Sequence, residues 1–171
     1  MQQASSLFTR LEYRLAEQLF HHRWLPRSPR TQRLTMRLFQ RCAKAGHVGA
    51  LSTYGHMLFH RGSSPQDKAR GARYVVEAAH NGDMRAQYQA GWIYEHGCAQ
   101  YPRREDHAVT WYARAGEAGH PLAADRLAKA YRAGSLGLAV DAQRAEHWQK
   151  LADRQLDAAT QEALPQATVN H

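Results

Sequence analysis

The segment that decides the fold is GDMRAQYQAGWIYEHGCAQYPRREDHAVTWYARAGEAG, residues 82–119, because its pattern recurs before and after it. A glycine followed four residues later by an alanine occurs three times, at steps of 36 and 37 residues: Gly46 with Ala50, Gly82 with Ala86, and Gly119 with Ala123. Aromatic residues keep the same register between and after these pairs: Tyr74, Trp111 and Trp148. Self-similarity at a constant step of this length is typical of stacked repeats.

Each copy of the pattern predicts two helices joined by a turn. The first half has small or apolar residues at every fourth position, hence on one helix face: Ala50, Tyr54, Leu58; Ala86, Ala90, Tyr94; Ala123, Leu127, Tyr131. The second half ends at Gly82 or Gly119, since glycine suits the left-handed residue that terminates a helix. We expect helices near residues 6–21, 31–45, 48–61, 67–80, 84–96, 105–117, 121–133 and 141–155.

The composition supports an all-α chain of one domain. The 171 residues and the 43% hydrophobic content suffice for a core, and valine and isoleucine are too scarce for an extensive sheet. We predict a capping helix and a basic, degenerate half-repeat over residues 1–45. Three repeats follow over residues 46–155, divided at about 46–81, 82–118 and 119–155. Residues 156–171, which are small and polar, are predicted to be a flexible tail.

Three local signals refine the helix predictions. Leu7, Leu11, Leu15 and Leu19 are spaced by four residues, so we expect them to cover the apolar face of the first repeat. The stretch WLPRSPR, residues 24–30, contains two prolines and predicts a break after that helix. Asp67 and Asp141 stand where they can accept backbone N–H bonds as the N-caps of two second helices.

These residues together resemble the Sel1-like repeat, a relative of the tetratricopeptide repeat. Residues 82–119 show the pattern best, with Gly82, Ala86, Ala90, Gly91, Tyr94, Gly97, Ala108, Trp111, Ala115 and Gly119. The likeness covers about residues 35–155; Ala128 replaces a usual glycine, and Gly71 a usual alanine. The resemblance implies a short right-handed α-solenoid of stacked antiparallel helix pairs. It also implies an adaptor or scaffold that binds proteins and is not an enzyme.

The candidate chemistry is sparse. His56 and His60 have the i, i+4 spacing of shared metal ligands, but no HExxH motif and no adjacent carboxylate accompany them, so no metal is expected. No nucleophile with a base and an orienting carboxylate is evident, and neither is a phosphate-binding glycine loop, so we expect no catalytic residue and no cofactor. Cys42 is predicted to be a core thiol, and its lack of a CxxC partner suits a reducing cytoplasm. No apolar run is long enough for a membrane span.

A groove for a partner is predicted on the first helix of each repeat, the helix that lines the concave side of related solenoids. The residues that avoid the buried stripe are Thr53, His56, His60, Gln89, Trp92, His96, Arg126, Lys129 and Arg132. Trp92 stands where the other copies have His56 and Lys129, which are polar, so we expect it to face the groove. A rigid aromatic side chain among polar groups is a typical interface anchor.

The basic charge is concentrated near the N-terminus. Of the formal net charge of +8, residues 1–45 contribute most, with nine Arg and Lys against two Glu. Five basic residues are spaced by three or four, as on one helix face: Arg30, Arg33, Arg37, Arg41 and Lys44. The leading hypothesis is therefore a scaffold for a protein or peptide, including an acidic one. The alternative is binding of nucleic acid or an anionic surface through this basic patch.

Overall fold

The computed structural model describes residues 2–21 and 29–163, and these residues form eight α-helices and no strand. The helices are α1 (Gln2–His21), α2 (Pro29–Lys44), α3 (Val48–Arg61), α4 (Pro65–His80), α5 (Met84–His96), α6 (Glu105–Glu117), α7 (Pro121–Ala133) and α8 (Ala142–Ala163). All eight predicted helices are confirmed, so the chain is all-α as expected. The predicted break at residues 24–30 lies mostly outside the described residues.

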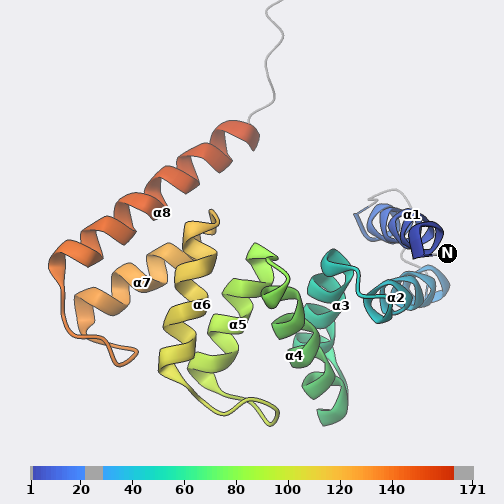
Figure 1. Cartoon of the computed structure of the whole chain (residues 1–171), viewed down its shortest axis with the longest axis horizontal. Helices are drawn as coiled ribbons and strands as arrows, with labels where there is room; N and C mark the ends of the chain where they lie inside the picture. Colours follow the sequence, from blue (N-terminus) through green and yellow to red (C-terminus); the bar gives the residue numbers. More distant parts are fainter. Residues whose placement is uncertain (1, 22–28, 164–171) are drawn as a thin grey trace, which may run out of the picture.

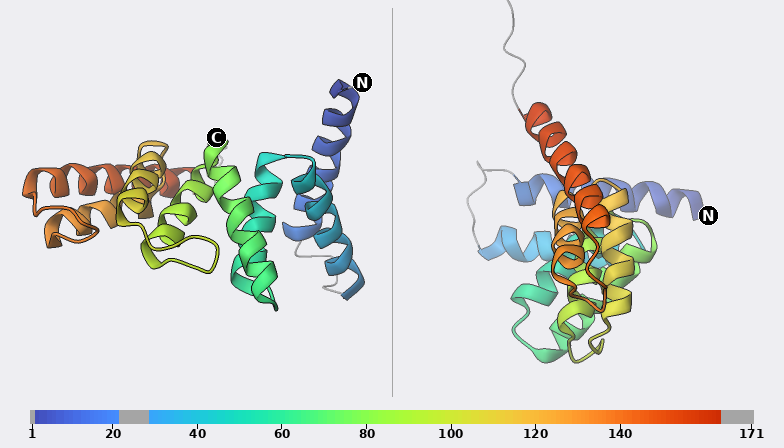
Figure 2. Two further views of the ribbon diagram at one scale, coloured as in Figure 1. Left: turned by 60° about the horizontal axis from the view of Figure 1, so that its bottom comes forward. Right: turned by 90° about the vertical axis from the view of Figure 1, so that its left-hand side faces the viewer.

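The helices form a stack of hairpins. Each odd-numbered helix packs on the even-numbered helix that follows it, and each hairpin packs on the next through α2 and α3, α4 and α5, and α6 and α7. Figure 1 shows the hairpins side by side along the molecule, with α1 lying above α2 at one end and α8 running upward from the other end. Figure 2 shows the same sequence of hairpins from two other directions. The result is a short, curved α-solenoid.

The repeated small residues allow the helices to approach closely. Ala50, Ala86 and Ala123 are completely buried, as their shared register predicts. The buried side chains form two neighbouring clusters, and Tyr94 packs against both of them. Trp111 is buried as expected, but Trp148 is only partly buried. The reason is its place on α8, which packs on α7 and has no helix on its other side among the described residues.

The turns between repeats use glycine where the backbone requires it. The backbone φ angle is +78° at Gly46, +89° at Gly82 and +105° at Gly119. Side chains other than glycine are strained in this left-handed region. The predicted helix ends at Gly82 and Gly119 are therefore correct.

The predicted helix caps hold at one site and not at the other. The Asp141 Oδ1 accepts a hydrogen bond from the Arg144 backbone N–H at 2.9 Å, so Asp141 caps α8 as expected. Helix α4 begins earlier than predicted, at Pro65, and its N-cap is Ser64, whose Oγ accepts from the Asp67 N–H at 3.1 Å. Asp67 is thus inside the first turn, because the Ser-Pro pair supplies a cap and a preformed first residue.

Replacing Asp141 with alanine is expected to lower the free energy of unfolding by about 1 kcal/mol, because the first turn of α8 loses its side-chain acceptor. Asp67→Ala is the matched control and should cost less, since Ser64 still caps α4. Urea titration of both variants measures the difference. Equal losses would contradict this assignment of the caps.

Two predictions for the ends of the chain are corrected. In α1, Leu7, Leu11 and Leu15 are exposed, and the helix packs on α2 and α3 through a different face. That face contains Tyr13, Ala16 and Phe20, with Leu19 partly buried beside them: Phe20 meets the Phe39 ring edge-on at 5.9 Å.

Helix α8 continues to Ala163, so the boundary of the flexible tail at residue 156 is also wrong. The segment from 156 to 163 has small and long straight-chain residues that favour helix, and it extends a helix already started on α7. Residues 164–171 of the predicted tail lie outside the described residues.

Candidate functional site

The candidate site is the face formed by α3, α5 and α7, the first helices of the three repeats. Helical spacing of three or four residues repeats on each of them and places their polar and aromatic side chains in rows. The structure brings five of the nine predicted residues into one connected group: His56, His60, Gln89, Trp92 and His96. Thr53 lies one turn before His56 on the same helix.

Trp92 is the centre of this group, which we call the aromatic ladder. Its ring stacks on the His96 ring at a centroid distance of 4.2 Å, and it meets the Phe59 ring edge-on at 6.0 Å. The His60 ring lies 6.1 Å away from the Trp92 ring. Trp92 nevertheless remains 37% exposed. The neighbouring rings therefore hold the indole in place while one side of it stays open.

His56 joins α3 to α5 at the edge of the ladder. Its ring lies 4.5 Å from the His60 ring, and its Nδ1 is 2.5 Å from the Gln89 Nε2. Because the amide nitrogen can only donate, the Nδ1 of His56 is the acceptor in this bond.

Burial and the nearby His56 both lower the pKa of His60 from its ordinary value of 6.5. Desolvation is the larger cause, because it penalises the charged imidazolium. His60 is therefore uncharged at pH 7. The His60 ring therefore presents uncharged aromatic surface beside Trp92.

Arg126, one of the predicted groove residues, belongs to a partly buried ion pair with Glu95. Its Nε lies 3.2 Å from both carboxylate oxygens of Glu95, which also accepts a hydrogen bond from the Tyr112 hydroxyl at 2.7 Å. Burial by itself raises the Glu95 pKa, but the bonds from Arg126 and Tyr112 outweigh it and hold that pKa below its ordinary value. This network joins α5, α6 and α7 and leaves the guanidinium little freedom to bind a partner.

The remaining basic residues of the predicted groove stay accessible. Lys129 is exposed and pairs with Asp125 on its own helix at 2.7 Å. Arg132 is exposed, and its Nη2 is 3.5 Å from the Gln149 Oε1 of α8. Exposed pairs of this kind are weak, so both side chains can exchange their present partners for an acidic one.

The sequence analysis missed a hollow of about 430 Å³ beside the aromatic ladder. It is lined by residues of α1, α2, α3 and the start of α5: Tyr13, Glu17, Phe20, Phe39, Gly49, Ser52, Thr53, His56, Met57, Asp83, Met84, Arg85 and Gln89. Within it the Tyr13 hydroxyl donates to Glu17 at 2.7 Å, and the Ser52 hydroxyl donates to Asp83 at 2.8 Å. Burial and the bond to Glu17 raise the pKa of Tyr13 to about 12, so it remains a donor. No motif signals this hollow, because its walls come from separate repeats.

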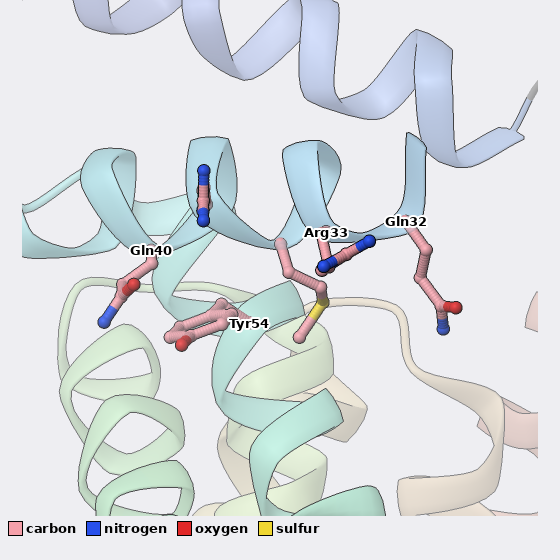
Figure 3. Close-up of a pocket in the computed structure, with 6 residues that line it drawn as sticks. Gln32, Arg33, Gln40 and Tyr54 are labelled. Carbon is pink, nitrogen blue, oxygen red and sulfur yellow. The ribbon is translucent and has the colours of Figure 1, made fainter. Parts of the chain in front are cut away.

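The predicted basic patch lies along the exposed side of α2. Arg30, Arg33, Arg37, Arg41 and Lys44 are all exposed, and Arg41 forms an ion pair with Glu12 of α1 at 2.9 Å. A second hollow of about 440 Å³ adjoins the patch and is lined by Gln32, Arg33, Met36, Arg37, Gln40 and Tyr54. Figure 3 shows Gln32, Arg33 and Gln40 extending from α2 toward the side where Tyr54 lies.

Other kinds of site have little support in the described part of the chain. Residues 2–21 and 29–163 contain no group of three His, Cys, Asp or Glu residues arranged to hold a metal ion. Among these same residues, no helix has both the length and the apolar character needed to cross a bilayer. Cys42 is buried, as predicted, and neither Cys42 nor Cys98 forms a disulfide.

Comparison with known proteins defines the class of fold. No protein-family model matches the sequence, and no curated protein matches it. Among solved structures, a Sel1 repeat protein from Oxalobacter formigenes is similar, with a TM-score of 0.72 and 24% identity over 85% of this chain. The protective antigen c5321 of uropathogenic Escherichia coli strains, which displays an SLR fold, is similar with a TM-score of 0.75 and 25% identity over 90% of this chain.

These likenesses identify the chain as an all-α solenoid. More particularly, it has the fold of a Sel1-like repeat protein, which confirms the resemblance drawn from its repeated residues. The match covers 58% of the length of the first structure and 32% of the second. The present chain is therefore the shorter solenoid in both comparisons.

Proposed function

We propose that this chain is a non-enzymatic scaffold that binds an extended segment of another protein along the face of α3, α5 and α7. The observation that carries the proposal is the aromatic ladder, in which Trp92 is held by three rings and still offers an open side. A preordered aromatic side chain loses little conformational entropy on binding, so it is suited to anchor a partner.

The chemistry of the face indicates what kind of segment it takes. The indole of Trp92 and the uncharged ring of His60 favour an apolar or aromatic side chain. Farther along, on α7, the exposed Lys129 and Arg132 favour an acidic residue. The proposed partner is therefore a peptide segment with an apolar or aromatic anchor and an acidic residue one repeat away from it. The cytoplasm remains the proposed location, and the two unpaired cysteines support it.

The test uses peptides selected from a displayed random library on the immobilised chain. Trp92→Ala is expected to weaken binding of a selected peptide about 30-fold, which corresponds to about 2 kcal/mol. Lys129→Glu should weaken peptides that contain the acidic residue and spare those that lack it. The matched control is Arg73→Ala, which alters an exposed residue of α4 outside the face.

Calorimetry and circular dichroism of the same variants separate binding from folding. Trp92→Ala is expected to leave the helical content unchanged, because its ring is partly exposed. Selected peptides that bind Trp92→Ala as tightly as the original chain would refute the proposed face. Equal weakening by Arg73→Ala would refute it as well.

The basic patch on α2 supports a second candidate function, the binding of phosphate groups of a nucleic acid. Arg33 and Arg37 line a hollow together with the amide side chains of Gln32 and Gln40. Phosphate binding is steeply weakened by salt through counterion release, whereas an apolar anchor changes little with salt. Titration of duplex DNA at rising salt concentration, with Arg37→Glu as the variant, tests this candidate separately from the peptide face.

A further inference from the structure

One exposed surface of the molecule has no role in the fold or in the proposed groove. Of the ten large apolar side chains that are exposed in the described residues, six belong to α1 and α2. Leu7, Phe8 and Leu11 are 61%, 69% and 62% exposed, and Leu15 follows one turn later. Leu7, Leu11 and Leu15 are spaced by four residues, and Phe8 precedes Leu11 by three, so all four lie on one face of α1. We call these four residues the apolar face of α1.

The packing of α1 does not use this face. The helix is held on its opposite side, where Tyr13 stacks on His47 at 4.1 Å and Ala16 is fully buried. The buried Cys42 thiol donates to the Thr9 carbonyl at 3.6 Å on that side as well. Substitution of an exposed leucine therefore leaves the interior contacts of α1 in place.

Positive charge borders the apolar face. Arg10 and Arg14 are exposed and follow Leu7 and Leu11 by three residues, so they lie beside the leucines on the helix surface. The Arg41–Glu12 ion pair joins the basic patch of α2 to this part of α1. Arg37 lies one turn before Arg41 on the same face of α2 and is exposed. The apolar stripe is thus bordered by arginines of its own helix, and the Arg41–Glu12 pair brings one end of the basic patch of α2 next to α1.

We propose that the apolar face of α1 and its bordering arginines dock on the surface of an anionic lipid bilayer. Such a surface accepts bulky apolar side chains at the boundary of headgroups and acyl chains, and anionic headgroups attract the arginines. The helix lies in the interface and does not cross it.

Charge and shape on this surface favour a bilayer over other occupants. A second copy of the chain would bring the same arginines together, and like charges oppose that pairing. Neither of the two hollows described above includes any of Leu7, Phe8 or Leu11, so neither offers this face a recess for a peptide side chain. A nucleic acid would use the arginines but leave the leucines in water.

The test is sedimentation of the full chain with vesicles. One set contains phosphatidylcholine and phosphatidylglycerol in equal amounts, and the other contains phosphatidylcholine alone. The chain is expected to pellet with the anionic vesicles and to be released by salt. Leu11→Glu is expected to lower binding at least about tenfold, because a charge replaces buried apolar surface. Arg37→Glu should lower binding through the electrostatic contribution.

Leu122→Glu is the matched control, because Leu122 is an equally exposed leucine on α7, at 54%. It should leave vesicle binding unchanged, and circular dichroism should show both leucine variants to be folded. The proposal is overturned if the chain binds neither set of vesicles, or binds both sets equally. It is also overturned if Leu11→Glu binds anionic vesicles as the original chain does.

Two further measurements test whether this surface binds a second copy of the chain or a nucleic acid in place of a bilayer. Sedimentation velocity that shows a dimer abolished by Leu11→Glu would assign the face to a second copy. Duplex DNA binding that Arg37→Glu abolishes and Leu11→Glu preserves would assign the arginines to nucleic acid. These results concern α1 and α2, so they leave the proposed peptide face on α3, α5 and α7 unaffected.

Discussion

Gly71→Ala is expected to lower the free energy of unfolding by about 3 kcal/mol, through overpacking where α4 crosses α3. A Cβ at this position would lie 2.4 Å from the Phe59 backbone nitrogen and 2.7 Å from the Gly55 carbonyl oxygen. Backbone atoms cannot rotate away, so the two helices must separate. A loss of stability would be informative, because replacing glycine with alanine in a helix interior otherwise raises the free energy of unfolding by about 1 kcal/mol.

The matched control for this prediction is Gly49→Ala in α3. Its new Cβ would approach the Tyr13 ring and hydroxyl, the closest atom at 2.6 Å, and these atoms are at the end of a side chain that borders a hollow. Tyr13 can move, so the cost should be much smaller. Urea unfolding of the two variants gives the comparison. A stabilised Gly71→Ala would show that the α3 and α4 backbones are not in close contact.

Glu95→Gln is expected to cost about 2 kcal/mol at pH 7, because it removes the charge that Arg126 and Tyr112 jointly bind. The side chains of Glu95 and Arg126 are only 15% and 28% exposed, so water compensates little. Glu146→Gln is the control, since its pair with Lys150 on α8 lies at the exposed surface. That change should alter stability far less than Glu95→Gln does, because exposed ion pairs contribute little.

The pH dependence of the Glu95→Gln difference follows from its lowered pKa. The folded-state pKa of Glu95 lies below its ordinary value of 4.5, so its contribution is complete above that value. It is lost as the pH falls through the folded-state pKa. The stability difference between the original chain and Glu95→Gln should therefore shrink below pH 4.5. A difference that stays constant from pH 7 to the acid range would contradict the role of this carboxylate.

Much of the candidate site could be predicted from repeat register. Trp92 takes the position of the polar residues His56 and Lys129, and this comparison correctly predicted that it is not a core tryptophan. The contact of the Phe59 ring with the Trp92 ring could not be predicted in the same way. Phe59 comes from the preceding repeat and faces Trp92 only because the two helices lie side by side.

The ion pair of Arg126 could not be predicted by comparing equivalent positions of the repeats. Its position beside Leu127 indicated a surface residue, and the sequence pattern contains no signal for its partner. Glu95 lies 31 residues earlier, on α5, and the pair exists because α5 and α7 are neighbours in the stack. Tyr112 of α6 completes the network from a third helix.

The sequence by itself determined the eight helices and the buried alanine positions. These features depend on local periodicity and on glycines at turns, which are properties of each segment alone. Only the tertiary structure decided which face of α1 is buried, because both faces are apolar and the choice depends on the shapes of α2 and α3. The close approach at Gly71, the Glu95–Arg126 pair and the two hollows were decided in the same way. Each arises where side chains from different repeats meet, and the distance between them depends on how the helices cross.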